Sequence, residues 1–168
     1  MTKLSKSFFI RDVLDVAPDL LGKIIVIKHN DSFRQFVITE VEAYRGEEDM
    51  ACHASKGRTA RTEIMYHQGG FIYVYLIYGM YWMLNFVTGE ENNPQAVLIR
   101  AIQGANGPGK LTKKLLIDGS FYGENLYTSE RIWLEDKKRI KKITTSPRVG
   151  INYAGEPWIS KLWRFTIK

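Results

Sequence analysis

The chain has 168 residues, a mass of 19.4 kDa, 45% hydrophobic and 25% charged residues, and a formal net charge of +6. This composition is typical of one soluble globular domain, and no apolar run approaches the roughly 18 residues of a transmembrane helix. The apolar segment Phe8–Ile10 is too short for the core of a signal peptide, so secretion is not expected. The single cysteine, Cys52, excludes an internal disulfide and lacks the neighbouring ligands of a zinc site, so we expect no metal and no cofactor.

The positive charge gathers in three places. The sequence pI of about 9.4 suits an anionic partner such as nucleic acid, although charge alone is weak evidence. One group lies in a loop, another at the start of a predicted helix, and the third has the pattern of a solvated charge run: Lys56, Arg58 and Arg61, then Lys110, Lys113 and Lys114, then Lys137, Lys138, Arg139, Lys141 and Lys142. The first two groups flank the segments that carry the candidate site.

Hydrophobic periodicity and turn residues predict a few short helices and a larger number of strands. In chain order they are a helical region over 12–21 that is interrupted or restarted at Pro18, strands over 23–29 and 33–44, a polar loop over 45–62, a helical turn over 63–67, a hairpin over 71–85, a strand over 95–102, a helix over 108–117, and strands over 131–135, 149–153 and 162–167. The chain has no repeat and no Pro/Gly/Ser linker, so we expect one domain over 1–168. The predicted fold class is α+β, with a curved antiparallel β-sheet, peripheral short helices and a protruding β-hairpin.

The strand over 33–44 brings two carboxylates to one face. Alternation predicts that one face of the strand is polar and consists of Ile38, Glu40, Glu42 and Tyr44. The opposite face is predicted to join the core and consists of Val37, Thr39, Val41 and Ala43. A buried Glu42 must be paired or used, either in a salt bridge to Arg100 or as a general base that deprotonates water. Glu40, about 7 Å away by strand rise, leaves open an inverting glycosidase that uses both carboxylates.

Two other places hold candidate polar groups. Arg100 is the single charge in the apolar strand over 95–102, so it needs a carboxylate or phosphate partner unless it faces solvent at a sheet edge. The helix start at Gly107–Lys110 offers backbone N–H groups that can hold a phosphate, but it lacks the Lys-Ser/Thr ending of a nucleotide P-loop. His53 lies in the polar loop, where a lone histidine is more often a loop or packing residue than a functional one.

The hairpin over 71–85 is the most distinctive stretch of the chain. It holds four tyrosines and a tryptophan, and a tight turn is expected at Gly79 because glycine adopts positive φ without cost. Tyr73 and Tyr75 share one face of the strand, and Tyr78 lies at the tip. A core hairpin is also aromatic, but each buried phenol needs a hydrogen-bond partner. The excess of tyrosine therefore indicates a surface that stacks flat rings.

Seven stretches together resemble the alkyladenine (3-methyladenine) DNA glycosylase family. They are TEVEAY at 39–44, GEEDMACHASKGRT at 46–59, YVYLIYGMYWMLN at 73–85, AVLIRA at 96–101, GPGKL at 107–111, RVGINYAGE at 148–156 and WRFTI at 163–167. One departure is Ala60-Arg61-Thr62, where family members more often carry Pro-Arg-Asn. The resemblance implies a monofunctional, metal-independent enzyme that removes damaged purines from duplex DNA by hydrolysing the N-glycosidic bond, with water as the nucleophile and no lyase step.

The resemblance also implies a role for each candidate site residue. Glu42 would activate the attacking water, and Arg100 would hold that carboxylate and water. Tyr44, His53 and Tyr75 would enclose the flipped base, with Tyr73 behind them and Asn85 at the floor, where it disfavours normal guanine. Tyr78 would enter the minor groove, supported by Met80 and Tyr81, and the predicted DNA contacts include Arg58, Arg61 and Lys110.

Two other classes of function stay open from the residues alone. One is a non-catalytic module that recognises damaged DNA or RNA through the same aromatic residues, and the other is a carbohydrate-active enzyme that uses Glu40 and Glu42. On the favoured hypothesis the partner is double-stranded DNA with damaged purines, bound by a monomer that does not act at a membrane. In a bacterium this protein would be cytoplasmic and associated with the nucleoid. The chain lacks the long polar N-terminal extension of larger relatives, so no nuclear targeting is expected.

Overall fold

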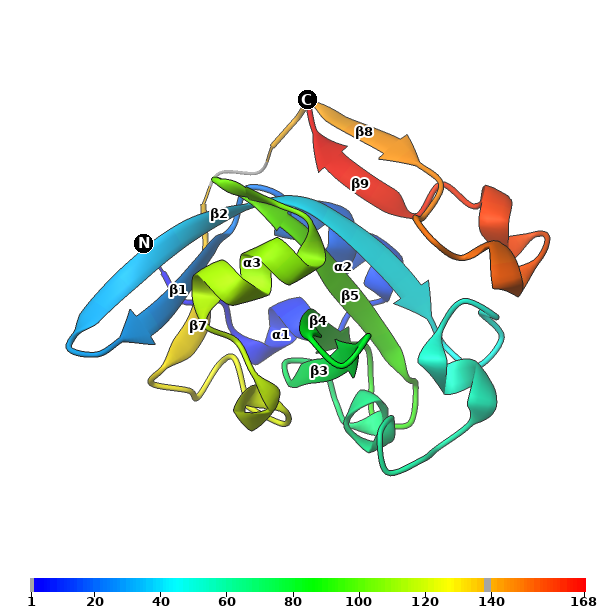
Figure 1. Ribbon diagram of the computed structural model, residues 1–168, viewed down its shortest axis with the longest axis horizontal. Helices are drawn as coiled ribbons and strands as arrows, with labels where there is room; N and C mark the ends of the chain where they lie inside the picture. The colour runs from blue at the N-terminus through cyan, green and yellow to red at the C-terminus, as the bar shows by residue number, and fades with distance from the viewer. Residues whose placement is uncertain (1, 138–139) are drawn as a thin grey trace.

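The computed structural model describes residues 2–137 and 140–168, so Lys138 and Arg139 of the predicted charge run lie outside the described residues. The described parts contain three α-helices and nine strands (Figure 1). The helices are α1 (Lys6–Phe9), α2 (Val13–Leu20) and α3 (Pro108–Leu115). The strands are β1 (Ile24–His29), β2 (Ser32–Arg45), β3 (Ile72–Ile77), β4 (Tyr81–Thr88), β5 (Gln95–Ile102), β6 (Ala105–Asn106), β7 (Ile132–Glu135), β8 (Ile143–Ser146) and β9 (Arg164–Ile167).

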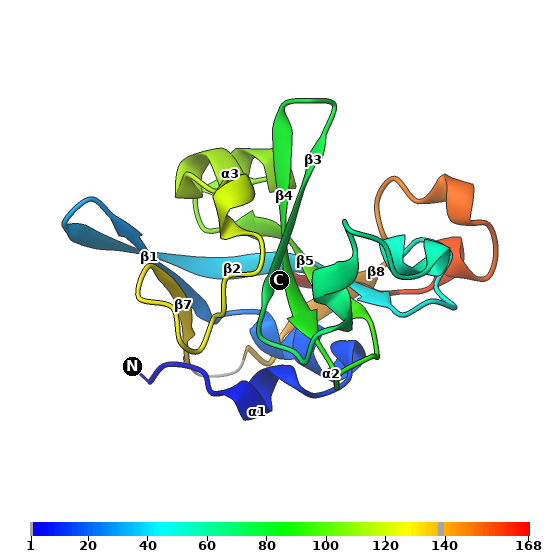
Figure 2. The ribbon, with the colours of Figure 1, turned by 90° about the horizontal axis from the view of Figure 1, so that it is seen from below.

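The strands form one antiparallel sheet in the order β3-β4-β5-β2-β1-β7, which confirms the α+β prediction. The 14-residue strand β2 pairs with β1, β5 and β9, while β8 joins through β9 and β6 through β5. Both ribbon views place α3 on one side of this sheet and α1 and α2 on the other (Figures 1 and 2). The β3–β4 hairpin projects from the body on the α3 side (Figure 2). Residues on β2 and β5 therefore lie beneath the base of this projection.

The core is built where helix α2 packs on the sheet. Asp12 caps this helix by accepting a hydrogen bond from the Leu14 amide at 2.9 Å, and Pro18 lies inside the helix without interrupting it. Its apolar stripe is fully buried against β2 and β5, and each valine or leucine side chain in it contributes about 1.5 to 3 kcal/mol relative to exposure. The stripe consists of Val13, Val16, Ala17 and Leu20.

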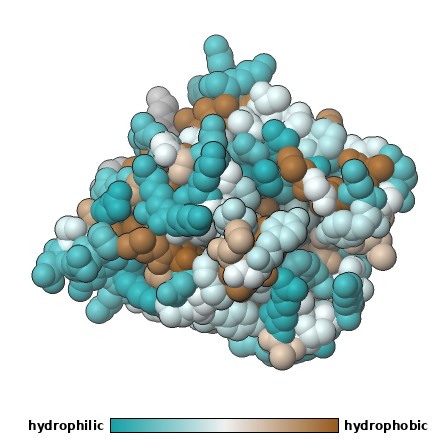
Figure 3. Space-filling model, in the orientation of Figure 1, coloured by the Kyte–Doolittle hydropathy of each residue, from teal (hydrophilic) through white to brown (hydrophobic). Residues whose placement is uncertain are grey.

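The face of the molecule in Figure 1 is mostly hydrophilic, with apolar side chains in separate small patches (Figure 3).

The predicted hairpin is confirmed, and its turn has an unusual backbone. Tyr78 and Gly79 have φ of 51° and 64°, and the Met80 amide donates to the Ile77 carbonyl at 3.0 Å, which defines a two-residue type I′ turn. This turn matches the twist of the flanking strands, but it forces a tyrosine into the left-handed region. The Tyr78 side chain is 85% exposed, so packing does not offset that cost.

The predicted faces of β2 are wrong in the first half of the strand. The pairing with β5 shifts register between Ile38 and Glu40 and again between Glu40 and Val41, which marks a β-bulge. An extra residue reverses the alternation, so Ile38 joins the core together with Val41, whereas Val37 and Thr39 remain partly exposed. The bulge thus lets the apolar side chains on both sides of it face the same core.

The predicted strand over 149–153 is also wrong. Gly150 has φ of 73°, and the chain then forms a 3₁₀ turn over Asn152–Ala154, with Ala154 N donating to Ile151 O. Left-handed backbone cannot continue a ladder, so the strand that pairs with β9 is β8, a segment not predicted as a strand. The remaining predicted helices and strands match within two residues at each end, except that the second strand of the hairpin continues three residues further, to Thr88. The one-turn helix α1 and the two-residue strand β6 were missed. Of the helices in the described ranges, none has the length and apolarity needed to cross a lipid bilayer.

The hairpin turn yields a stability prediction. Tyr78→Asn should raise the free energy of unfolding by up to about 1 kcal/mol, because asparagine adopts positive φ more readily and the exposed tyrosine ring has little packing to lose. Urea denaturation of the two proteins measures the difference. Tyr78→Ala is the matched control, since alanine retains the cost of left-handed backbone. An equal gain in both variants would assign the effect to loss of the ring and contradict the backbone explanation.

Candidate active site

A buried carboxylate lies at the centre of the candidate site. Glu42, on β2, has no exposed surface. Its Oε2 accepts a hydrogen bond from the Tyr44 hydroxyl at 2.8 Å, and its Oε1 accepts one from the Val149 amide at 2.7 Å and lies 3.6 Å from Arg100 Nε. Burial raises the pKa of the Glu42 carboxyl above its ordinary value, and Arg100 and the two hydrogen bonds oppose that rise. Such a carboxylate is suited to accept a proton from water.

The second carboxylate of the strand has a different environment. Glu40 Oε1 lies 3.0 Å from Arg100 Nε and 2.9 Å from Arg164 Nε, so two guanidinium groups face it. The prediction that Arg100 requires an acidic partner is therefore confirmed, with Glu40 as its hydrogen-bonded partner and Glu42 close by. Because two arginines neutralise Glu40, it is poorly placed to serve as the second catalytic carboxylate of a glycosidase.

An aromatic cavity adjoins the Glu42 carboxylate. It is lined by all five residues predicted to contact a base and by five others: Tyr44, His53, Tyr73, Tyr75 and Asn85, with Ala51, Cys52, Met65, Ala96 and Tyr153. Tyr44 links the two features, because its ring lines the cavity while its hydroxyl bonds Glu42, which is not itself in the lining. The ring centres of His53 and Tyr75 are 4.5 Å apart, less than the roughly 7 Å that a flat ring stacked between them would need. These rings must separate to admit a planar ligand.

His53 lies on the wall of this cavity as a neutral ring. Its Nδ1 is 2.8 Å from the Tyr73 hydroxyl. Burial, together with the positive charges of Arg61 and Lys56, lowers the pKa of His53 to about 4. An uncharged imidazole presents a face that can stack on another aromatic ring.

Asn85 lines the cavity and has an anchored side chain. It lies on β4, is buried, and donates from Nδ2 to the Tyr73 carbonyl at 3.2 Å across the β3–β4 pair. This bond ties the Asn85 side-chain amide to the backbone of the neighbouring strand and so fixes the orientation of the amide.

The side chains predicted to contact DNA differ in their exposure and in whether they already bind another residue. At the hairpin tip Met80 is 60% exposed beside Tyr78, while Tyr81 packs beneath the Lys113 ammonium at 5.1 Å. Lys110 is exposed in the first turn of α3, on the same side of the sheet as the hairpin. Arg58 instead forms a fork with Glu63 at 2.7 and 2.8 Å. Contact of Arg58 with a phosphate would therefore compete with this ion pair.

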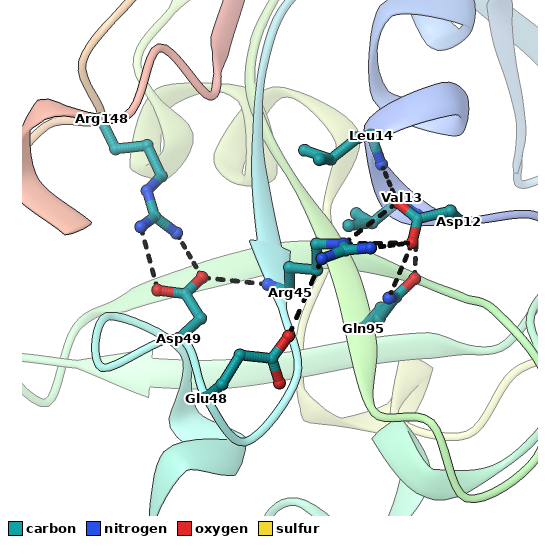
Figure 4. A network of polar contacts seen from close by, with 8 residues as sticks. All are labelled: Asp12, Val13, Leu14, Arg45, Glu48, Asp49, Gln95 and Arg148. Atoms are coloured by element: carbon teal, nitrogen blue, oxygen red, sulfur yellow. Dashed lines mark hydrogen bonds and ion pairs between the residues drawn. The ribbon is translucent and has the colours of Figure 1, made fainter. Parts of the chain in front are cut away.

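Sequence reasoning missed a buried ion pair that supports the site. Arg148 binds Asp49 through two contacts of 2.6 and 3.0 Å, and neither side chain is exposed (Figure 4). Asp49 also accepts from the Arg45 amide at 3.0 Å, and Arg148 donates to the Ala43 carbonyl at 3.0 Å (Figure 4 draws the first). The guanidinium lies between the rings of Tyr44 and Trp163, at 4.8 and 5.0 Å.

This ion pair connects three segments that are distant in the sequence. Arg148 packs against the ring of Tyr44 and directly precedes Val149 in the chain. The ion pair therefore holds in place the Tyr44 hydroxyl and the Val149 amide, which are the two groups that donate hydrogen bonds to Glu42. Periodicity carries no signal for such a pair, because both residues lie in irregular segments. The only indication was that each lies in a stretch that carries the family resemblance, GEEDMACHASKGRT and RVGINYAGE.

Breaking this ion pair should destabilise the fold. Arg148→Met is expected to lower the free energy of unfolding by about 3 to 5 kcal/mol, because the Asp49 charge stays buried without its partner. Adding Asp49→Leu should recover part of that loss, and a double-mutant cycle in urea measures the coupling. The exposed pair Arg58–Glu63 supplies the control, since Arg58→Gln should change stability little. Equal small effects of Arg148→Met and Arg58→Gln would contradict this account.

The pKa of His53 predicts a pH dependence of stability. The folded protein binds the proton only near pH 4, whereas the unfolded chain binds it near 6.5, so stability contributed by neutral His53 is complete above 6.5 and falls as the pH drops towards 4. His53→Asn should flatten this part of the profile. The measurement is the difference in free energy of unfolding between wild type and variant from pH 7.5 to 4. A difference that does not change over this range would contradict a neutral, buried His53.

The chain matches known proteins over nearly its whole length. The family model described as methylpurine-DNA glycosylase (MPG) matches residues 7–105 and 103–168. Several relatives carry the name "Putative 3-methyladenine DNA glycosylase". The one from Borrelia garinii subsp. bavariensis is 45% identical over 98% of this chain and 96% of its own length. The one from Methanocella arvoryzae is 43% identical over 98% and 92%. The one from Legionella pneumophila is 42% identical over 100% and 96%.

Proposed function

The chain belongs to the methylpurine-DNA glycosylase family and is a DNA N-glycosylase, and we propose that it is a monofunctional enzyme that excises alkylated and deaminated purines. The substrates are 3-methyladenine, 7-methylguanine, hypoxanthine and ethenoadenine in duplex DNA, and excision begins base excision repair. The observation that carries this proposal is the buried Glu42 carboxylate behind an aromatic cavity. We assign 1–168 to one glycosylase domain that acts as a monomer.

The aromatic cavity is the site of the extruded base. Extrusion costs a few kcal/mol and less for a damaged base. The base enters between His53 and Tyr75 as these rings move apart, with Tyr44 on the wall and Tyr73 behind. Alkylated purines carry positive charge, which the tyrosine faces attract. The fixed amide of Asn85 crowds the exocyclic amine of normal guanine and so disfavours it.

The hairpin tip replaces the extruded nucleotide in the duplex. Tyr78, at the end of the projecting hairpin, inserts its ring through the minor groove into the gap, and Met80 and Tyr81 support it. The left-handed backbone at Tyr78 supports this assignment, because strained residues without packing partners are concentrated at functional sites. Lys110, which is exposed in the first turn of α3, contacts a phosphate.

Hydrolysis proceeds by attack of water on the anomeric carbon. The water oxygen forms a bond to C1′, Glu42 accepts the water proton, and the electron pair of the C1′–N bond leaves with the base. Arg100 holds the Glu42 carboxylate and the water in line with the sugar. The raised pKa of Glu42 makes it a stronger base than an exposed glutamate. No lysine is among the described residues that line the cavity, which supports hydrolysis without a lyase step.

The first test uses duplex oligonucleotides that each hold one hypoxanthine, ethenoadenine or 7-methylguanine. Abasic sites are scored by alkaline cleavage under single-turnover conditions. Wild type should release each base, and Glu42→Gln should lower the rate at least about 100-fold while retaining lesion binding, because the amide cannot accept the proton. Glu40→Gln is the matched control on the same strand and should lower the rate less.

Three outcomes would revise the proposal. Lesion binding without cleavage by wild type would indicate a recognition module. Full activity in Glu42→Gln would leave a glycosylase with a different base. Equal losses in Glu40→Gln and Glu42→Gln, together with competition by free sugars, would favour a carbohydrate-active enzyme.

A further inference from the structure

A guanidinium group occupies part of the base-stacking surface in the free protein. The Arg61 Cζ lies 4.9 Å from the centre of the Tyr75 ring, in a cation–π contact. His53 and Tyr73 contact the same ring, at 4.5 and 5.3 Å between ring centres. Arg61 also lines an adjoining cavity that shares Ala51, Cys52, His53 and Tyr153 with the aromatic cavity. It therefore stands at the boundary of the base pocket, not only on the outer surface.

The backbone that carries Arg61 is held in place. The Tyr122 hydroxyl donates towards the carbonyls of Ala60 and Arg61, at 3.3 and 3.1 Å, and accepts from the Ile64 amide at 3.2 Å. Tyr122 in turn contacts the ring of Tyr73, with 6.2 Å between ring centres. The loop is thus anchored to the aromatic wall itself, and the position of Arg61 near Tyr75 follows from that anchoring.

The charge of Arg61 acts on the walls of the pocket. No ion pair found among the described residues includes its guanidinium, whereas Arg58 in the same loop is paired with Glu63. Burial raises the pKa of Tyr75 to about 12, and Arg61 is the largest opposing influence. Burial also raises the pKa of Tyr73, again against Arg61, and Arg61 adds to burial in lowering the pKa of His53. Three sides of the cavity therefore lie within reach of one uncompensated positive charge.

We propose that Arg61 is a specificity-determining residue that disfavours cationic purines relative to neutral ones, an inference that rests on the proposed function. A cationic base such as 7-methylguanine stacks on Tyr75 through the same cation–π attraction that Arg61 already uses. If Arg61 stays in place, the two positive charges repel each other at a few ångströms. If the base displaces Arg61, the cation–π contact of Arg61 is lost. Only the first of these penalties depends on the charge of the base, so the effect shows in the ratio of cationic to neutral substrates.

A phosphate contact of Arg61 would have a different signature. Phosphate contacts carry no information about the base, so losing one weakens binding of every lesion by about the same factor and reduces the salt dependence of binding. Selection by charge instead changes the order of substrates at a fixed salt concentration. The ratio of rates therefore separates the two roles.

The experiment measures single-turnover excision of three bases by wild type, Arg61→Gln, Arg61→Lys and Arg58→Gln. The bases are 7-methylguanine, which is cationic, and hypoxanthine and ethenoadenine, which are neutral, each in the same duplex sequence and salt. We expect Arg61→Gln to raise the rate for 7-methylguanine relative to both neutral bases by about tenfold. The ratio of the two neutral bases should not change, since a change in pocket shape would separate them.

The two other variants are the controls. Arg61→Lys keeps the charge and should keep the wild-type ratio, and Arg58→Gln removes a charge of the same loop that Glu63 already compensates, so its ratio should also match wild type. An unchanged ratio in Arg61→Gln, or the same shift in Arg58→Gln, would overturn the proposal while leaving the glycosylase intact. Release of none of the three bases by wild type would instead overturn the proposed function, and this inference with it.

Discussion

A carboxylate without access to water must be satisfied by the protein, and the site is arranged around this requirement at Glu42. Tyr44 and Val149 donate to its two oxygens, and Arg100 lies near one of them. Those donors in turn need support, which the Arg148–Asp49 pair provides by stacking on Tyr44 and fixing the backbone next to Val149. The burial of Glu42 thus accounts for the second buried charge pair, even though burying that pair is itself costly.

The turn of the hairpin has a backbone that its own sequence disfavours. A type I′ turn favours glycine or asparagine at both central positions, yet Tyr78 occupies one of them with its side chain in solvent. Among the described residues, no contact explains that choice. A ring held away from the body of the protein on a rigid two-stranded projection can, however, enter a groove without first becoming ordered, which reduces the entropic cost of binding (Figure 2).

The net charge of +6 does not tell which basic side chains are available to bind an anion, because some arginines are already paired with carboxylates. In one loop, Arg58 is compensated by Glu63, while Arg61 faces the aromatic cavity without an acidic partner among the described ion pairs. The two residues have the same formal charge and lie three positions apart, yet only Arg61 lies over a ring that lines the aromatic cavity. Basic residues near a DNA-binding site are therefore not interchangeable, and their acidic neighbours decide which remain available.

The sequence by itself determined the α+β class, the tyrosine hairpin with its tip, most strand positions and the family, because these depend on local periodicity, turn residues and contiguous motifs. Tertiary structure alone decided the bulge that places Ile38 and Val41 on one core face, the turn over 149–153, and the pairing of Arg148 with Asp49. These features arise from contacts between segments up to about a hundred positions apart, and periodicity within one strand or loop carries no information about such contacts.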